Sequence, residues 1–118
     1  MLLRPDHPAE LQCAAQAVAA GELLGLPTET VYGLAARADD DAAVARIFEA
    51  KGRPADHPLI VHVLDVDGAR RFAAELPPLA LRLMRAFWPG PLTVIVPRAA
   101  GVATAAAGGQ DTIGLRCP

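Results

Sequence analysis

One short stretch of the chain combines two cations, two prolines and two histidines. Residues 51–63 read KGRPADHPLIVHV, and Lys51 is the only lysine among the 11 lysine and arginine residues of the chain. Lys51 stands where a predicted helix over 41–50 meets Gly52, a residue typical of helix ends, and Arg53 follows. Because the two prolines stiffen the segment, both cations are held at a rigid connection between helix and strand. An ammonium and a guanidinium in this setting suit a phosphate or another anion.

A structural interpretation of the same residues stays open beside the chemical one. Lys51 and Arg53 are equally suited to neutralising the negative end of the preceding helix dipole. His62, in a short apolar strand predicted over 59–63, is either a ligand contact or a core histidine with its hydrogen bonds satisfied, and the second is the commoner use of such a residue.

A second polar cluster lies upstream of this stretch. Residues 27–33, PTETVYG, predict a turn that places three hydroxyls and one carboxylate directly after the apolar run 23–26. Because every buried polar group needs a hydrogen-bond partner, such a cluster belongs at the rim of a pocket. The structural alternative is that Thr28 or Thr30 caps a helix, while Tyr32 buries its ring and bonds a carbonyl oxygen through its hydroxyl.

Several familiar sites are absent from the sequence. There is no GxxxxGK[ST] phosphate loop, no GxGxxG dinucleotide fingerprint and no GxSxG nucleophile elbow. His7, His57 and His62 do not combine with cysteine or glutamate at zinc-ligand spacing. The run Asp39–Asp41 precedes a helical pattern and therefore predicts a helix N-cap with an acidic first turn. We expect no metal-binding residues.

Composition limits the class of protein. With 118 residues, a formal net charge of −2 and 53% hydrophobic residues, we expect residues 1–118 to form a single globular domain. The charge balance disfavours a broad cationic surface for nucleic acid or membrane, so an anion site has to be local. Two cysteines, Cys13 and Cys117, favour a reduced, cytoplasmic protein, although pairing between them stays open. The sequence contains no secretory signal and no membrane-spanning run.

Helical and strand patterns alternate along the chain. Helices are predicted over residues 8–20, 41–50, 65–74 and 77–87, and strands over 23–26, 59–63, 92–96 and 112–116. The apolar residues spaced along the first helix are Leu11, Ala14, Ala15 and Val18, and those of the last helix are Leu79, Leu83, Met84 and Phe87. Residues 88–91, WPGP, predict a hard turn, and the alanine-rich stretch 99–109 predicts a flexible loop. The alternation predicts an α/β layer fold and leaves strand direction undecided.

Three motifs occur together in one order: PTETVYGL at 27–34, KGRPADHPLIVHV at 51–63 and WPGPLT at 88–93. In this combination the chain resembles, from about Gly21 to Pro118, the threonylcarbamoyl-AMP synthase family, also called the YrdC-like family. The resemblance implies a twisted mixed sheet with flanking helices around a concave basic cavity. It further implies that L-threonine, bicarbonate and ATP are joined into threonylcarbamoyl-AMP with release of pyrophosphate. A partner complex would then transfer the threonylcarbamoyl group to adenosine in certain tRNAs.

The resemblance also implies roles for individual residues. The expected catalytic residues are Lys51 and Arg53, which would hold ATP and share the phosphate charge with Mg²⁺. Two further expected ATP-binding residues are His57 and Thr112. The expected threonine-binding residues are Thr30, Tyr32, His62 and Arg116. We expect no tightly bound cofactor.

The chain departs from the family pattern at two points. His57 stands where the family usually has asparagine. The chain stops at Pro118, before a Ser-Ala-Asn motif that closes the nucleotide side in the family. We therefore expect a shortened domain with one cavity wall open and an exposed sheet edge, which favours dimerisation or aggregation.

Two other functions stay open. One is a non-catalytic module that binds double-stranded RNA or tRNA, and the other is a relative that handles carbamoyl phosphate, as YrdC-like domains do in hydrogenase maturation. The acidic balance and the lack of aromatic residues interleaved with basic ones disfavour the RNA-binding module.

Overall fold

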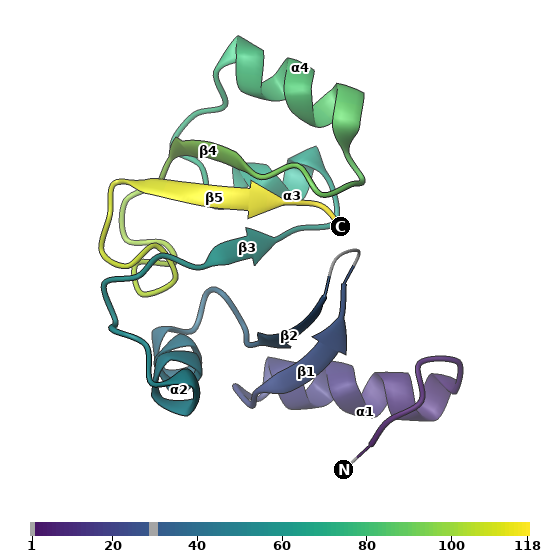
Figure 1. Cartoon of the computed structure of the whole chain (residues 1–118). Helices are drawn as coiled ribbons and strands as arrows, with labels where there is room; N and C mark the ends of the chain where they lie inside the picture. The colour runs from purple at the N-terminus through teal and green to yellow at the C-terminus, as the bar shows by residue number, and fades with distance from the viewer. Residues whose placement is uncertain (1, 29–30) are drawn as a thin grey trace.

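A computed structural model describes residues 2–28 and 31–118 of the chain. In chain order the elements are α1 (Pro8–Ala19), β1 (Leu24–Pro27), β2 (Tyr32–Ala35), α2 (Asp41–Lys51), β3 (Ile60–His62), α3 (Val66–Arg70), α4 (Pro78–Phe87), β4 (Val94–Pro97) and β5 (Thr112–Arg116) (Figure 1). This order confirms the mixed α/β class, and the prediction for β5 matches its bounds. No helix within the described ranges has the length and apolar content to cross a membrane.

The strands form two small sheets. β1 and β2 make an antiparallel hairpin in which Pro27 lies opposite Tyr32. The second sheet has the order β3-β5-β4, with β5 parallel to β3 and antiparallel to β4. Figure 1 shows the hairpin, α1 and α2 in one half of the molecule, and the three-stranded sheet with α3 and α4 in the other.

The hydrophobic core lies on one face of the three-stranded sheet. Successive side chains of a strand point to opposite faces, so alternate residues of β4 and β5 enter the core. The buried strand residues are Val61, Val94, Val96, Ile113 and Leu115, and they form one cluster with Phe72, Ala80 and Met84. The other face of β3 and β5 carries Ile60, His62, Thr112, Gly114 and Arg116, so core and exposed residues alternate along the same strands.

The ends of α2 follow the signals in the sequence. The Asp40 carboxylate accepts hydrogen bonds from the amides of Ala42 at 3.1 Å and Ala43 at 3.2 Å, which confirms the predicted N-cap. Gly52 has a left-handed φ of 64° and ends the helix, as predicted, because such a conformation costs glycine little. Lys51 consequently occupies the last turn.

The predicted turn over residues 27–33 is wrong in extent, because β2 begins inside it at Tyr32. The connection is closed by Thr28, whose hydroxyl donates to the Val31 carbonyl and accepts from the Val31 amide at 3.2 Å. Thr28 is therefore a hairpin residue and not a helix cap. Strand β2 was not recognisable from its sequence, YGLA, because glycine and alanine are both depleted in strands.

The alanine-rich stretch is also not the loose loop that its composition predicts. Ala103, Ala106 and Ala107 are buried, and the Leu59 amide donates to the Ala106 carbonyl at 2.7 Å. Methyl side chains fill a core where neighbouring backbones lie close together, which a low-complexity pattern does not reveal.

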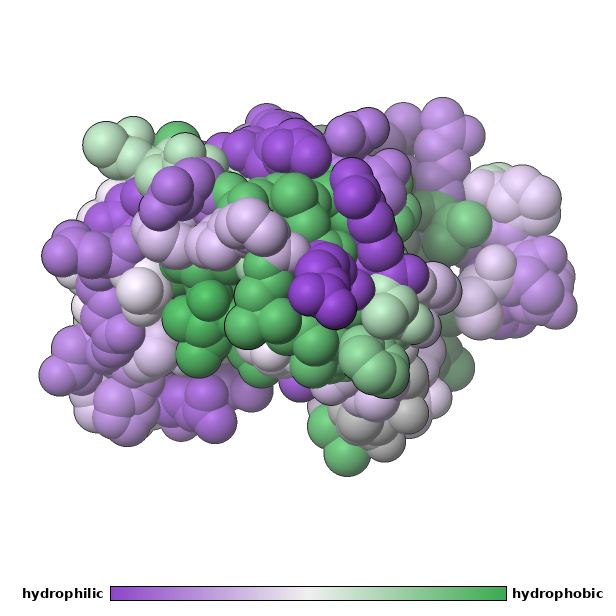
Figure 2. All heavy atoms as spheres, turned by 90° about the horizontal axis from the view of Figure 1, so that it is seen from above, coloured by the Kyte–Doolittle hydropathy of each residue, from purple (hydrophilic) through white to green (hydrophobic). Residues whose placement is uncertain are grey.

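The predicted apolar helix faces are only partly buried. In α1, Ala14 is buried while Leu11 is 55% exposed, because this helix packs beside a hairpin of only two strands. In α4, Met84 is buried while Leu79 and Phe87 are 65% and 61% exposed. Figure 2 views the molecule from the side on which α4 lies and shows hydrophobic side chains gathered at its centre.

Helix α3 ends four residues before the predicted end at residue 74. The residues that follow it join the edge of β4: Ala73 bridges Arg98, and the Ala74 amide donates to the Pro97 carbonyl at 2.8 Å. These strand-like contacts replace the last turn of the predicted helix. Asp65 still caps it, accepting from the Gly68 amide at 2.8 Å.

Helix α4 offers a matched test of the core. Met84→Ala leaves a cavity where the side chain is fully buried, so we expect the free energy of unfolding to fall by about 2–5 kcal/mol. Leu79→Ala on the exposed side of the same helix should change it by no more than about 0.5 kcal/mol. Urea titration followed by far-UV circular dichroism measures both, and similar losses for the two variants would contradict this assignment of the core.

Candidate functional site

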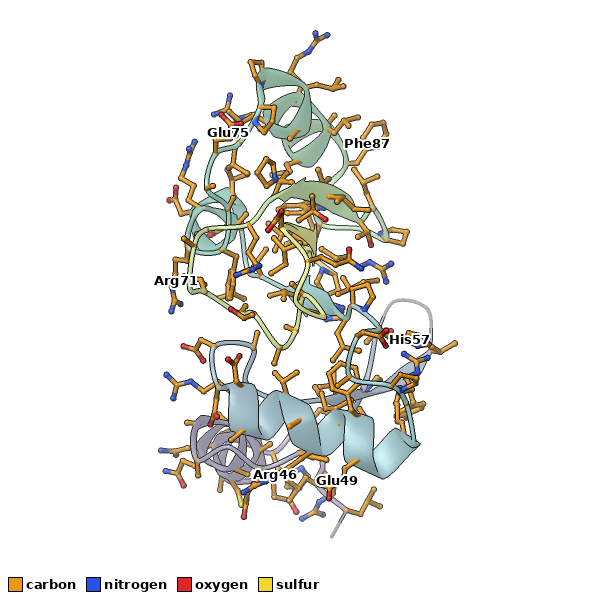
Figure 3. The ribbon with its side chains drawn as sticks, turned by 90° about the vertical axis from the view of Figure 1, so that its left-hand side faces the viewer. Arg46, Glu49, His57, Arg71, Glu75 and Phe87 are labelled. Carbon is orange, nitrogen blue, oxygen red and sulfur yellow. The ribbon has the colours of Figure 1, made fainter. Side chains whose placement is uncertain are left out.

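A pocket of about 510 Å³ lies between the two halves of the molecule. Its wall combines the β1–β2 hairpin, α2, β3, the end of β5 and Ala106. The polar and ionisable residues that line it are Thr28, Lys51, His62 and Arg116, and most of the remaining lining is aliphatic, including Leu34, Val44, Ile47 and Leu59. Figure 3 shows the two halves from the side, with α2 below and the three-stranded sheet above. The consecutive elements from β1 to β3 therefore meet Ala106 and Arg116, which are distant in sequence, around one space.

Lys51 reaches the pocket from the last turn of α2. The residue is exposed, and none of the ion pairs formed by residues 2–28 and 31–118 includes it. Its position also satisfies the structural interpretation, because a cation in the last turn complements the helix dipole. The two interpretations are compatible, since the ammonium at the helix end also borders the pocket.

His62 and Arg116 are brought together by the pairing of β3 with β5. The two residues lie directly opposite each other in the parallel register, so their side chains leave the sheet on the same face. His62 is exposed, and its alternative interpretation as a core histidine is therefore wrong. The half-buried Arg116 donates from Nε to the Thr93 hydroxyl at 3.0 Å, which fixes the orientation of its guanidinium.

The other residues predicted for this site lie elsewhere. Arg53, His57 and Thr112 are exposed and do not line the pocket, and Figure 3 shows His57 on the connection from α2 to β3. Tyr32 is 81% exposed and is not part of the wall, although its neighbours in the hairpin are. The predicted residue Thr30 lies outside the described residues.

Two contributors were missed by reasoning from the sequence alone. Thr93 belongs to the motif WPGPLT and holds Arg116, so a signal was present but its partner was not recognisable. Ala106 forms part of the wall and carried no signal, because it stands in a low-complexity stretch.

A second cavity of about 400 Å³ shares His62 and Ala38 with the first. Its cations are already paired: Arg37 Nε lies 2.6 Å from an Asp39 carboxylate oxygen, and Arg71 lies 3.8 Å from the same carboxylate. The hydrogen bond from Arg37 lowers the pKa of Asp39, and the same bond raises the pKa of Arg37. Asp65 also lines this cavity, so its two arginines are balanced by two carboxylates.

Comparison with known proteins connects this geometry to a family. Residues 16–118 match the family model Sua5/YciO/YrdC, described as "Telomere recombination". The threonylcarbamoyl-AMP synthase of Pyrococcus abyssi is 48% identical over 109 residues, which is 92% of this chain and 32% of that protein. The synthase of Bacillus subtilis is 42% identical over 106 residues, or 89% and 31%. The chain thus spans about a third of the length of these relatives.

A solved structure gives the same result. P. abyssi Sua5 complexed with L-threonine superposes with a TM-score of 0.91 at 46% identity, covering 95% of this chain and 33% of that one. The superposition confirms the predicted YrdC-like arrangement of helices and strands. The motifs, the fold and the match over residues 16–118 agree, and the chain belongs to the Sua5/YciO/YrdC family.

Proposed function

We propose that the chain acts as an L-threonylcarbamoyladenylate synthase, which joins L-threonine, bicarbonate and ATP into threonylcarbamoyl-AMP and releases pyrophosphate. The observation that carries the proposal is the pocket that Lys51, His62 and Arg116 line together. It is supported by 48% identity to a protein named for this activity.

The reaction needs cations because its two reacting groups repel each other. The carboxylated amine of threonine attacks the α-phosphorus of ATP, a bond forms from the carbamate oxygen to phosphorus, and the bond to pyrophosphate breaks. Both partners are anionic, and negative charge grows on the phosphoryl oxygens and on the leaving group. Fixed positive charge at this point stabilises the transition state more than the substrates.

We assign this charge first to Lys51, at the pocket, and then to Arg53, two residues along the chain. His57 and Thr112 remain our proposed residues on the nucleotide side. Among the described residues the pocket lining contains no carboxylate, which is the hard oxygen ligand that Mg²⁺ prefers. We therefore assign Mg²⁺ to the phosphates of ATP, where it would share their charge with Lys51.

We assign the threonine side of the pocket to His62 and Arg116, with Thr30 and Tyr32 of the hairpin as further proposed contacts. A guanidinium held by Thr93 is pre-oriented for the threonine carboxylate, because less side-chain freedom is lost on binding. A site that hydrogen-bonds the substrate hydroxyl would reject valine, since valine leaves those polar groups unpaired.

The proposed product determines which partners we expect for the protein. Its threonylcarbamoyl group would pass to adenosine in tRNA through a separate transfer complex, and we propose the cytoplasm as the place of this reaction.

Self-association is a further proposal. Ile95 of β4 is 70% exposed, and an apolar side chain exposed on the face of a sheet favours contact with a second copy.

The two alternatives make different predictions for the same assay. An RNA-binding module would show salt-sensitive RNA binding without release of pyrophosphate. A carbamoyl-transferring relative would consume carbamoyl phosphate. Release of pyrophosphate from ATP only when threonine and bicarbonate are both present tests the synthase against both alternatives.

Removal of the pocket ammonium tests the phosphate assignment. We expect Lys51→Ala to lower the rate of pyrophosphate release by about 10²–10³, the effect typical of losing one electrostatic contact to a transition state. Arg85→Ala is the matched control, because Arg85 is also an exposed cation in the last turn of a helix but lies outside the pocket. Equal rates for Lys51→Ala and the wild type, with both folded, would refute the assignment.

Replacement of the pocket histidine tests the threonine assignment. We expect His62→Ala to weaken L-threonine binding about tenfold, which corresponds to the loss of roughly one hydrogen bond. Calorimetric titration measures the affinity, and the melting temperature should stay within about 2 °C of the wild type because the side chain is exposed. His7→Ala, at the start of α1, serves as the control. A large fall in melting temperature with threonine affinity retained would contradict the prediction.

A further inference from the structure

The alanine-rich segment 99–110 is folded around a single arginine. Arg98 follows β4, and its Nε donates to the Gln110 carbonyl at 2.8 Å. Its Nη1 donates to the Val102 carbonyl at 3.1 Å and to the Thr104 hydroxyl at 3.2 Å. One guanidinium therefore joins the middle of the segment to its end. No ion pair formed within residues 2–28 and 31–118 involves Arg98, and its guanidinium donates to carbonyl and hydroxyl oxygens.

The segment in turn contacts the elements that carry the pocket. The Ala105 amide donates to a carboxylate oxygen of Asp41, the first residue of α2, at 3.2 Å. The Leu59 amide, directly before β3, donates to the Ala106 carbonyl at 2.7 Å. These two bonds tie the start of α2 and the start of β3 to the same short stretch of backbone.

Close packing reinforces this attachment. Gly108 has a φ of +62°, and a Cβ atom built there would lie only 2.6 Å from the Asp56 carbonyl oxygen. The segment thus lies directly against the connection between α2 and β3, which carries Arg53 and His57. Ala106 also forms part of the pocket wall. The shape of the segment therefore determines where Ala106 lies in the pocket wall. It also determines how closely the connection between α2 and β3 approaches the segment.

We propose that Arg98 is a positioning residue of the pocket: it does not line the pocket, but it holds the segment 99–110 in the shape that places Ala106 in the wall and fixes the backbone at residues 56–59. The methyl groups of this segment offer little contact area, so the guanidinium supplies the directional bonds that define its fold. That the position of Ala106 affects ligand affinity rests on the function proposed above. That Arg98 holds the segment 99–110 in shape does not depend on that function.

Amide hydrogen exchange followed by NMR tests the positioning without any ligand. In Arg98→Ala we expect the Leu59 and Ala105 amides to exchange about tenfold faster, because the Ala106 carbonyl that accepts from Leu59, and the Ala105 amide itself, are no longer held in place. The Val63 amide, which donates to the Arg116 carbonyl at 2.8 Å within the sheet, is the internal control and should keep its rate. Arg98→Lys retains the charge but not the planar fork, so we expect intermediate exchange rates. Arg85→Ala controls for the loss of an arginine and should change none of these rates.

Affinity measured on the same variants separates positioning from a general loss of stability. With L-threonine and with ATP as probes, well below the melting temperature, we expect Arg98→Ala to raise Kd about tenfold and Arg98→Lys to restore part of it. Unchanged Leu59 and Ala105 exchange in Arg98→Ala would overturn the proposal, as would a lower melting temperature with unchanged affinity. If Arg98→Ala does not fold, Arg98→Lys and Thr104→Val carry the same comparison. If the wild type binds neither probe, the proposed function fails while the exchange rates still decide the role of Arg98.

Discussion

The parallel register between β3 and β5 is the constraint on which the candidate site depends. His62 lies opposite Arg116 and Ile60 opposite Gly114, while Val61 between them is buried. Because side chains alternate with a period of two, a slip of one residue would turn His62 into the core and place Val61 on the opposite, exposed face of the sheet. Burial of apolar residues on one face of the sheet thus fixes the polar residues on the other. The pocket histidine and arginine need no separate device to bring them together.

The second constraint is the abrupt end of α2. Asp40 begins the helix, Gly52 ends it, and the helix therefore always delivers Lys51 to its last turn. A lysine placed one position earlier or later on this helix would have its ammonium rotated by roughly 100° about the helix axis and away from the pocket. The site is then completed by the segment 99–110, which joins the start of this helix to β3. The position of Lys51 therefore depends on the helix signals at Asp40 and Gly52 and on the packing of the segment 99–110.

What could be predicted from the sequence was local. The cap at Asp40, the stop at Gly52 and the bounds of β5 each depend on a few neighbouring residues, and all three were predicted. The pairing of β3 with β5 was not, since it joins residues about fifty positions apart and a strand pattern does not name its partner. Among site residues, Lys51, His62 and Arg116 lie around one pocket. Arg53, His57 and Thr112 do not line it, because the direction of an exposed side chain depends on backbone turns that composition does not determine.

A chain with a formal net charge of −2 can still hold an anion, because the potential at a site is set by the charges within about 10 Å of it. The two cavities show how the chain separates its cations. Arg37 and Arg71 share the carboxylate of Asp39, and Asp65 adds a second carboxylate to the lining, so the smaller cavity is close to neutral. The larger pocket has Lys51 and Arg116 in its wall and, among the described residues, no carboxylate. Among the described residues its lining therefore carries cationic but no anionic side chains although the chain is acidic, and the reaction that we propose between two anionic substrates would require such an excess of positive charge.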